Sequence, residues 1–340
     1  MRRVLAVLAA GLVLVTGCST EPRQAGGSLQ VAESLVAATP AAAPPQTATP
    51  AGTVVPLHRP VTALAFDATT RTVAVAVGQP DELLLYPLDQ LTTPDAQPVR
   101  TLPLPGAPAQ LTLAGPGGPL LVPVPTADQV LQVPLPSGDP TVLTVTGGPT
   151  SAALVGQHLA VGVPGAGGVA VLRDGQEERR IPSFQSAAGL YPIGEQLLVL
   201  DNLHTSVTVV DPTTGTVKEA LRAGDGATHA VTDRYDRLLV VDTRGGELLV
   251  FSAEPALLMR QRFPVPGAPW AIAYDSRRDL AWITLTATNE VVGYDVAGGE
   301  PVERHRFPTV HQPQTVAVDP DSGTVLVASA DGEGIQVVQP

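Results

Sequence analysis

The residues of this chain with the chemistry to bind or react are acidic, histidine and tryptophan side chains that stand beside short apolar runs. Carboxylates can hold a cation or an amine, histidine can transfer protons, and tryptophan offers a flat ring for stacking. The candidates recur from residue 81 to residue 331, and they are Asp81, Asp128, Asp201, His204, His229, Asp242, Trp270, Glu290 and Asp331. Their recurrence indicates that a repeated structure positions them.

A second interpretation of the acidic candidates is structural. Asp and Asn are common in turns because their side chains accept hydrogen bonds from nearby backbone N–H groups. For each acidic residue, a role in capping a turn therefore stands beside a role in binding a ligand. Trp270 likewise is either a core residue at the start of a strand or a platform for a ligand, and both interpretations stay open at this stage.

Catalytic arrangements are sparse in this chain. The candidate base–acid pairs are His204 with Asp201 and His229 with Asp233. The sequence contains no Gly-x-Ser-x-Gly elbow, no His-x-x-x-His metal pair and no glycine-rich phosphate loop. One carboxylate in each loop is too sparse for Ca²⁺, except within residues 331–334. We therefore predict no catalytic residue, no metal site and no cofactor, and hence a protein that is not an enzyme.

The positioning elements emerge from an internal repeat. Seven times from Val61 onward the chain alternates turns with short apolar runs, such as residues 73–77 and 238–241, which are typical of buried strands. The first strands of the units begin near Val61, Pro108, Pro149, Ala187, Ala227, Pro269 and Pro313, at an average spacing of 42 residues. Periods of about 40–50 residues are typical of propeller blades. We predict an all-β fold, a seven-bladed β-propeller of four-stranded antiparallel blades.

The two ends of the repeat predict how the ring closes. The last unit, residues 313–340, is long enough for only three strands. Residues 53–58, Thr-Val-Val-Pro-Leu-His, form a short apolar strand directly before the first unit. An open ring would expose two apolar flanks, because each blade buries its faces only against its neighbours. We therefore predict that this N-terminal strand completes the seventh blade.

In a propeller, the loops from second to third strands and the loops between blades emerge on one face, around the central channel. The acidic candidates and His204 fall in loops of the first kind, whereas His229 and Trp270 fall near loops between blades. We call these nine residues the predicted rim. The rim would form a negatively lined funnel for a cation, an amine or a basic loop of a partner.

The repeat units resemble the YVTN-type repeats of bacterial extracytoplasmic propellers and, more loosely, lactonase-like and NHL-type propellers. Residues 316–329 carry the family's first strand ending in Asp-Pro, its Gly turn and its second strand. Residues 207–215 match the third strand, and residues 271–275 with 282–284 match the first and second strands. The resemblance covers residues of about 53–340 and implies the fold, not an activity. The tetrapeptide that names the family is degenerate in every unit.

The N-terminus has the features of an export signal. Arg2 and Arg3 precede an apolar stretch of 12 residues, 4–15, which is too short to span a bilayer. The junction at Gly17 and Cys18 resembles the bacterial lipobox. That resemblance implies that residues 1–17 are removed, that Cys18 is acylated, and that the protein is held on the extracytoplasmic face of the cell membrane.

Residues 18–52, between the lipidated cysteine and the propeller, are rich in Ala, Pro and Thr. Such a composition favours an extended chain without a packed core. We therefore predict a disordered tether over 18–52 and a propeller over 53–340.

The charge of the chain limits its partners. The formal net charge is −12, with 20 basic and 32 acidic residues. This balance disfavours nucleic acid and an anionic membrane surface, although an acidic surface also serves solubility. We expect a monomer that binds a protein of the cell envelope or a small ligand, one that is cationic if the rim is its site. The alternative is a propeller enzyme of the lactonase-like or a related hydrolase or lyase type, with its chemistry in the central channel.

Overall fold

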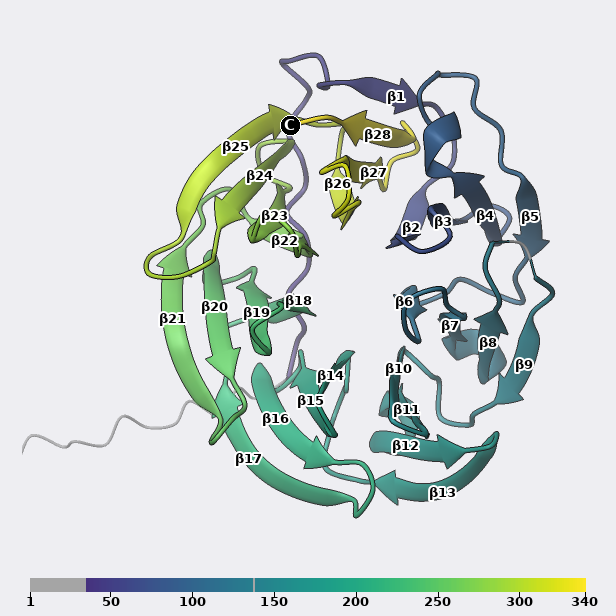
Figure 1. Cartoon of the computed structure of the whole chain (residues 1–340), viewed down its shortest axis with the longest axis vertical. Coiled ribbons are helices and arrows are strands. Elements are labelled where there is room, and N and C mark those ends of the chain that lie inside the picture. Colours follow the sequence, from purple (N-terminus) through teal and green to yellow (C-terminus); the bar gives the residue numbers. More distant parts are fainter. Residues whose placement is uncertain (1–34, 137) are drawn as a thin grey trace, which may run out of the picture. The chain divides into compact units, whose positions relative to one another are not determined.

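The computed structural model describes residues 35–136 and 138–340. The predicted signal peptide, Cys18 and the first part of the predicted tether lie outside these residues. Residues 36–340 form one compact unit, in which seven four-stranded antiparallel sheets stand around a centre (Figure 1). The predicted all-β, seven-bladed propeller is confirmed. In the described ranges, no helix is long and apolar enough to cross a membrane.

Each blade runs outward from its first strand, which faces the centre. The strands of blades 1 to 4 are β2 (Val61–Asp67), β3 (Thr72–Val77), β4 (Glu82–Pro87) and β5 (Arg100–Pro103); β6 (Thr112–Leu113), β7 (Leu120–Val124), β8 (Gln129–Val133) and β9 (Thr141–Thr144); β10 (Ser151–Val155), β11 (His158–Val163), β12 (Gly168–Arg173) and β13 (Gln176–Ile181); β14 (Gly189–Ile193), β15 (Gln196–Asp201), β16 (Ser206–Asp211) and β17 (Thr216–Arg222).

Blades 5 and 6 repeat this order, and blade 7 takes its outer strand from the other end of the chain. Their strands are β18 (Ala227–Thr232), β19 (Arg237–Asp242), β20 (Glu247–Ser252) and β21 (Leu258–Pro264); β22 (Pro269–Asp275), β23 (Leu280–Leu285), β24 (Glu290–Asp295) and β25 (Val302–Pro308); β26 (Pro313–Val318), β27 (Val325–Ser329), β28 (Ile335–Val338) and β1 (Thr53–Val55). Three single turns of 3₁₀ helix lie at Leu88–Gln90, Pro125–Ala127 and Pro164–Ala166.

The predicted first strands begin where expected in blades 1, 5, 6 and 7 and within two residues in blades 3 and 4. Blade 2 differs, because its first strand has only two residues and starts at Thr112 rather than near Pro108. Pro108 has no N–H group, and neither does Pro123 in the facing strand β7. A single backbone hydrogen bond, from Ala109 N to Pro123 O at 3.0 Å, replaces the ladder there.

Successive side chains of the middle strands point alternately toward the two neighbouring blades. In β3, Val73, Val75 and Val77 pack toward blade 7, whereas Ala74 packs toward blade 2. Successive side chains of a strand point to opposite faces of its sheet, and here both faces are covered. This is why the middle strands are apolar throughout rather than alternating with polar residues.

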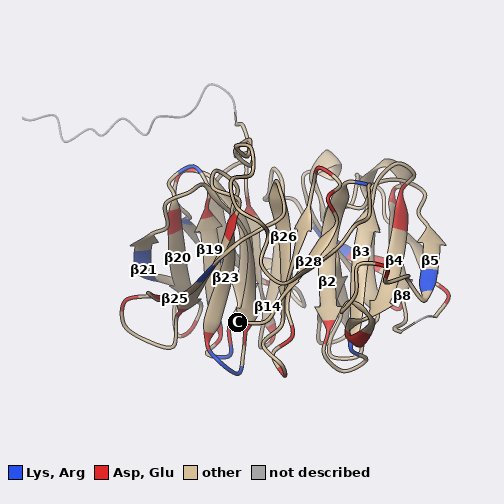
Figure 2. Cartoon of the chain, turned by 90° about the horizontal axis from the view of Figure 1, so that it is seen from above, with Lys and Arg blue, Asp and Glu red and all other residues tan. Residues whose placement is uncertain are grey.

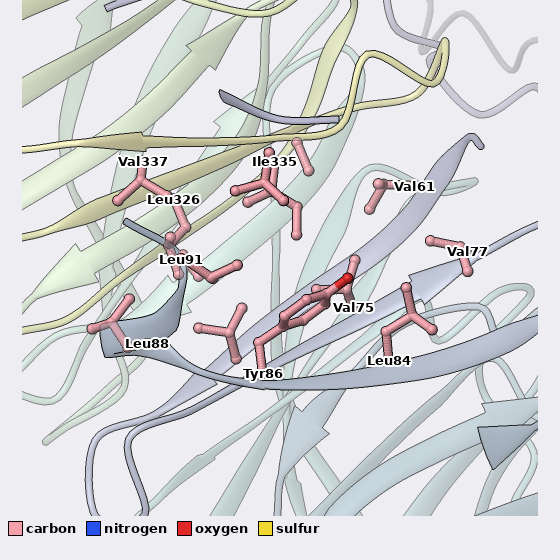
Figure 3. Close-up of a cluster of buried hydrophobic side chains, with 14 residues drawn as sticks. Val61, Val75, Val77, Leu84, Tyr86, Leu88, Leu91, Leu326, Ile335 and Val337 are labelled. Carbon is pink, nitrogen blue, oxygen red and sulfur yellow. The ribbon is translucent and has the colours of Figure 1, made fainter. Parts of the chain in front are cut away.

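The core consists of seven separate apolar clusters, one between each pair of neighbouring blades. Figure 3 shows the cluster between blades 7 and 1, where Tyr86 and Leu91 from blade 1 lie near Leu326 and Ile335 from blade 7. Val55 of β1 belongs to the same cluster and is 1% exposed. Ring closure is therefore part of the core.

The closing strand pairs as predicted. β1 lies antiparallel to β28, with Thr53 opposite Val337 and Val55 opposite Ile335. A second contact between blades 1 and 7 joins the guanidinium of Arg71 to the buried carboxylate of Asp319 at 3.2 Å. That contact and the Arg234–Asp279 pair between blades 5 and 6 join the turns of neighbouring blades.

The predicted tether was wrong for residues 36–52, because these residues lie against the propeller. The segment before β1, drawn in purple, crosses blades 5, 6 and 7 in the view of Figure 1, and its backbone bonds to loops of these blades. We call residues 36–50 the strap. An Ala/Pro-rich sequence cannot form its own core, yet it can follow a surface that supplies hydrogen-bond partners.

The closing strand can be tested by placing a charge in its cluster. Val55→Asp puts a carboxylate into the buried space between blades 7 and 1, and we expect it to lower the free energy of unfolding by about 3 kcal/mol or more. At about 2–4 °C per kcal/mol this lowers Tm by at least about 6 °C in a scanning calorimeter. Val99→Asp, at a valine that is 53% exposed, is the matched control. Equal melting temperatures for the two variants would contradict the closure.

Candidate functional site

The central channel contains a cavity of about 630 Å³ walled by the first strands of six blades. The wall is built from small apolar, hydroxyl, amide and aromatic side chains, and no Asp, Glu, Lys or Arg contributes to it. The size lies in the range of small-molecule sites, about 300–1,000 Å³. A charged ligand would find no counter-charge in this wall, so the channel suits an uncharged ligand.

Aromatic side chains gather at one mouth of this channel. Tyr191 of β14, His229 of β18 and Trp270 of β22 line both the channel and a second cavity of about 420 Å³ at its mouth. The rings of His229 and Trp270 meet edge to face, with centroids 4.8 Å apart and planes at 68°. Three neighbouring blades thus present three rings to one space, which is an arrangement that can hold a flat or apolar group.

Tyr191 is held at the mouth with its hydroxyl proton uncommitted. The Ala230 N–H donates to its Oη at 3.1 Å, and burial raises the pKa of the phenol to about 12. The phenol therefore stays neutral and keeps one O–H donor. Its ring covers Gly189, where an added Cβ would come within 2.4 Å of Oη. Gly189 makes room for the ring.

His229 contributes a nitrogen without a partner. Its Nδ1 is buried and neither accepts nor donates a hydrogen bond. Burial lowers the pKa of the ring to about 4, and a hydrogen bond with the Trp270 backbone opposes part of this lowering. The hydroxyls of Thr150 and Thr315 are likewise buried and unpaired at the mouth and in the channel. Buried polar atoms normally have partners, so an unpaired nitrogen and an unpaired hydroxyl at the mouth and a further unpaired hydroxyl in the channel point to a ligand or ordered water there.

The acidic candidates lie outside the cavity, and three of them cap turns. Asp242 is fully buried and accepts hydrogen bonds from the N–H groups of Asp225, Gly226 and Gly245 at 2.8–2.9 Å. Asp201 and Asp128 do the same in blades 4 and 2. Each of these carboxylates joins a loop between blades to its own blade. The expected negatively lined funnel is therefore not present in the channel, because these carboxylates serve the backbone.

The remaining candidates of the predicted rim lie apart from one another. Glu290 pairs with Arg306 at 2.7 Å, and Asp331 contacts His311 at 2.6 Å. Asp81 is half-buried in the turn before β4, and His204 contacts Asp201 at 3.0 Å. Figure 2 shows acidic residues in loops at both edges of the ring, not gathered at one place. Of the nine predicted residues, the structure brings only His229 and Trp270 together in a site.

Sequence reasoning missed Tyr191 and the strap as parts of the mouth. Tyr191 sits early in a first strand, as Trp270 does, and this shared position in the repeat is the signal that could have identified it. Ala38 of the strap is buried and lines the mouth cavity beside Trp270. No motif in the sequence connects residue 38 with blade 6.

Metal ligation has little support in the described ranges. Among residues 35–136 and 138–340, no three His, Cys, Asp or Glu side chains are grouped so that they could hold a metal ion. The candidate pair of His229 with Asp233 is also not formed, since the carboxylate of Asp233 is engaged by Arg237 at 2.6 Å.

Comparisons with known proteins identify the fold. No family model matches the chain, and no curated protein matches it significantly in sequence. A chain of Kuenenia stuttgartiensis hydrazine synthase is similar in structure, with a TM-score of 0.67 and 14% identity over 87% of this chain and 99% of that chain. The β-propeller domain of Myceliophteria thermophila Cps50 (Swd1) has a TM-score of 0.66 and 12% identity over 82% and 97%. At such identities the likeness shows the propeller fold alone.

The burial of His229 predicts a pH dependence of stability. The ring is neutral in the folded chain down to a pKa of about 4, whereas the unfolded chain takes up the proton near pH 6.5. Protons therefore favour the unfolded chain, and stability falls between pH 6.5 and 4 by about 2–3 kcal/mol on account of this group. His229→Gln should remove that part of the fall in urea unfolding measured across this range. Identical pH profiles for both chains would contradict a buried neutral imidazole.

Proposed function

We propose that this protein is an extracytoplasmic lipoprotein whose propeller is a non-catalytic binding module, and that it takes an uncharged ligand into its channel. The observation that carries the binding role is the channel with its mouth, two cavities without charged side chains that are lined by three aromatic rings and three unpaired buried polar atoms. Such a wall suits a ligand with a flat or apolar body and a few hydroxyl or amide groups.

The absence of acid–base machinery in this wall supports binding over turnover. Burial lowers the pKa of His229 to about 4, so its imidazole is neutral at neutral pH and does not serve as a general acid. The carboxylate beside His204 caps a turn. Neither pair that the sequence suggested has a free base next to a free acid at the channel.

The location is proposed from the N-terminal sequence. Arg2 and Arg3, the apolar stretch after them and the Gly17–Cys18 junction have the order of a lipoprotein signal. Acyl chains on Cys18 would hold the chain at the outer face of the cell membrane. We also propose that this propeller is related to the YVTN-type propellers that its repeats resemble. Those propellers are extracytoplasmic, which agrees with the proposed location.

The binding role is tested by ligand capture from a cell-envelope extract. The full-length chain, Trp270→Ala and the control Tyr235→Ala are each incubated with the small-molecule extract, and retained compounds are compared by mass spectrometry. Tyr235 is an aromatic residue outside the channel wall and 45% exposed. We expect a compound that the unchanged chain and Tyr235→Ala retain and that Trp270→Ala retains at least about tenfold less. Equal retention by all three proteins would contradict the channel as the site.

The anchor is tested by fractionation of cells that express the unchanged chain or Cys18→Ser. We expect the unchanged chain in the membrane fraction with the mass of a processed, acylated N-terminus, and the variant in the soluble fraction, because no other covalent lipid site is proposed. A variant that stays in the membrane fraction, or an unchanged chain without acyl mass, would remove the anchor from this account.

A further inference from the structure

The strap lies in a groove whose side chains bind a peptide backbone. Gln312 uses both ends of its amide, since Oε1 accepts the N–H of Ala43 at 2.9 Å and Nε2 donates to the Ala41 carbonyl at 2.9 Å. Thr286 Oγ1 accepts the Ala41 N–H at 3.1 Å, and Asn289 Nδ2 donates to the Pro44 carbonyl at 2.8 Å. These bonds alternate along the strap as they would along any extended chain.

The groove is built into the propeller and is not a chance surface contact. With the strap in place, Thr286, Asn289 and Gln312 are 0%, 6% and 8% exposed. The Gln312 N–H donates to Asn289 Oδ1 at 3.0 Å, which turns the amide nitrogen of Asn289 toward the strap. Thr286 Oγ1 also donates to the Ala268 carbonyl at 3.2 Å, so its lone pair faces the strap. The side-chain amide of Gln312 and the Nδ2 of Asn289 bond to the strap, so an empty groove would leave these polar groups without the partners they have here.

The strap itself is held loosely. Of residues 35–50 only Ala38 is buried, and most of the others are exposed. The strap is therefore retained by a few hydrogen bonds, each of small net worth in water, and not by apolar burial. Gln46 adds bonds to the Thr309 carbonyl at 2.8 Å and to Glu333 at 3.3 Å near one end, and Arg244 donates to the Val36 carbonyl at 3.0 Å at the other.

The chemistry of the strap defines what the groove accepts. The bonds go to backbone atoms, and the side chains at the bonded positions are those of Ala41, Ala43 and Pro44. Proline has no N–H group and favours an extended backbone, so a proline beside the bonded residues costs no hydrogen bond and lowers the entropy lost on binding. The alanine- and proline-rich strap is thus the kind of extended peptide that the groove accepts.

We propose that this groove over blades 5 to 7 is a binding site for an extended alanine- and proline-rich segment of a partner protein, and that the strap is an exchangeable ligand of the same chain. The site is separate from the channel, although Ala38 touches the channel mouth. Departure of the strap would remove that wall of the mouth cavity. The segment of a partner replaces the strap at Thr286, Asn289 and Gln312.

The probe is a labelled synthetic peptide with the sequence of residues 36–48, titrated by fluorescence anisotropy. The full-length chain is compared with a variant in which residues 38–46 are replaced by Gly and Ser at equal length. We expect saturable binding to both proteins, at least about tenfold tighter to the variant, because the linked strap competes at an effective concentration in the millimolar range. Binding to the variant alone, with none to the unchanged chain up to millimolar peptide, would show a permanent strap and overturn the exchange.

Matched controls separate the groove from other surfaces. A peptide with proline in place of Ala41 and Ala43 keeps its extended form but lacks both N–H donors, and we expect at least about a tenfold loss of affinity. Gln312→Ala in the variant should cause a similar loss, whereas Gln97→Ala, at an exposed glutamine in blade 1, should cause none. Unaltered affinity for Gln312→Ala, with cooperative melting retained, would overturn the proposal. If the unchanged chain forms concentration-dependent dimers that exchange straps, the occupant of the groove is a second copy of this chain and not a partner protein, which would overturn that part of the proposal.

Discussion

The apolar contact between neighbouring blades is the constraint on which the rest of this structure depends. Each middle strand sends alternate side chains to two neighbours, so a blade has no core of its own. Seven clusters of this kind require a closed ring, since one open interface would expose the faces of two blades. Val55 and the pairing of β1 with β28 supply the closure.

Closure has consequences for the face that carries the channel mouth. β1 is fixed at the outer edge of blade 7, and the residues before it cross the propeller along the loops of blades 7, 6 and 5. The first strands pack sideways and leave the centre unfilled, so the cavity is walled by whatever side chains those strands turn inward. The channel therefore has a wall without charged side chains, and the strap lies next to its mouth.

The architecture could be predicted from the sequence because each repeat unit carries the apolar runs that pack between neighbouring blades. Apolar runs covered on both faces and a period of 42 residues follow from the blade interfaces, and the short last unit with the strand at residues 53–55 follows from closure. The acidic residues were ambiguous for a physical reason. Asp201 and Asp242 have the residue type and loop position that both a ligand site and a turn cap require, and only their bonds to backbone N–H groups decide between the two.

The strap and the mouth cluster were beyond sequence reasoning. Ala41 and Ala43 have no side-chain chemistry, and their partners Thr286 and Gln312 are 245 and 269 positions away. Tyr191 lies in blade 4 and Trp270 in blade 6, so their approach to one cavity depends on the curvature of the ring and not on spacing in the chain. Composition predicted a segment without a packed core of its own, but it carries no information on where such a segment lies.

The most direct measurement of the central claim is native-state hydrogen exchange of the backbone amides in β1 and β28. If β1 closes the ring, its paired amides exchange only on global unfolding, with the same opening free energy as amides of β28 and of the middle strands in other blades. Exchange of the β1 and β28 amides through a separate opening of low free energy, while the other blades stay protected, would contradict closure as the basis of the fold.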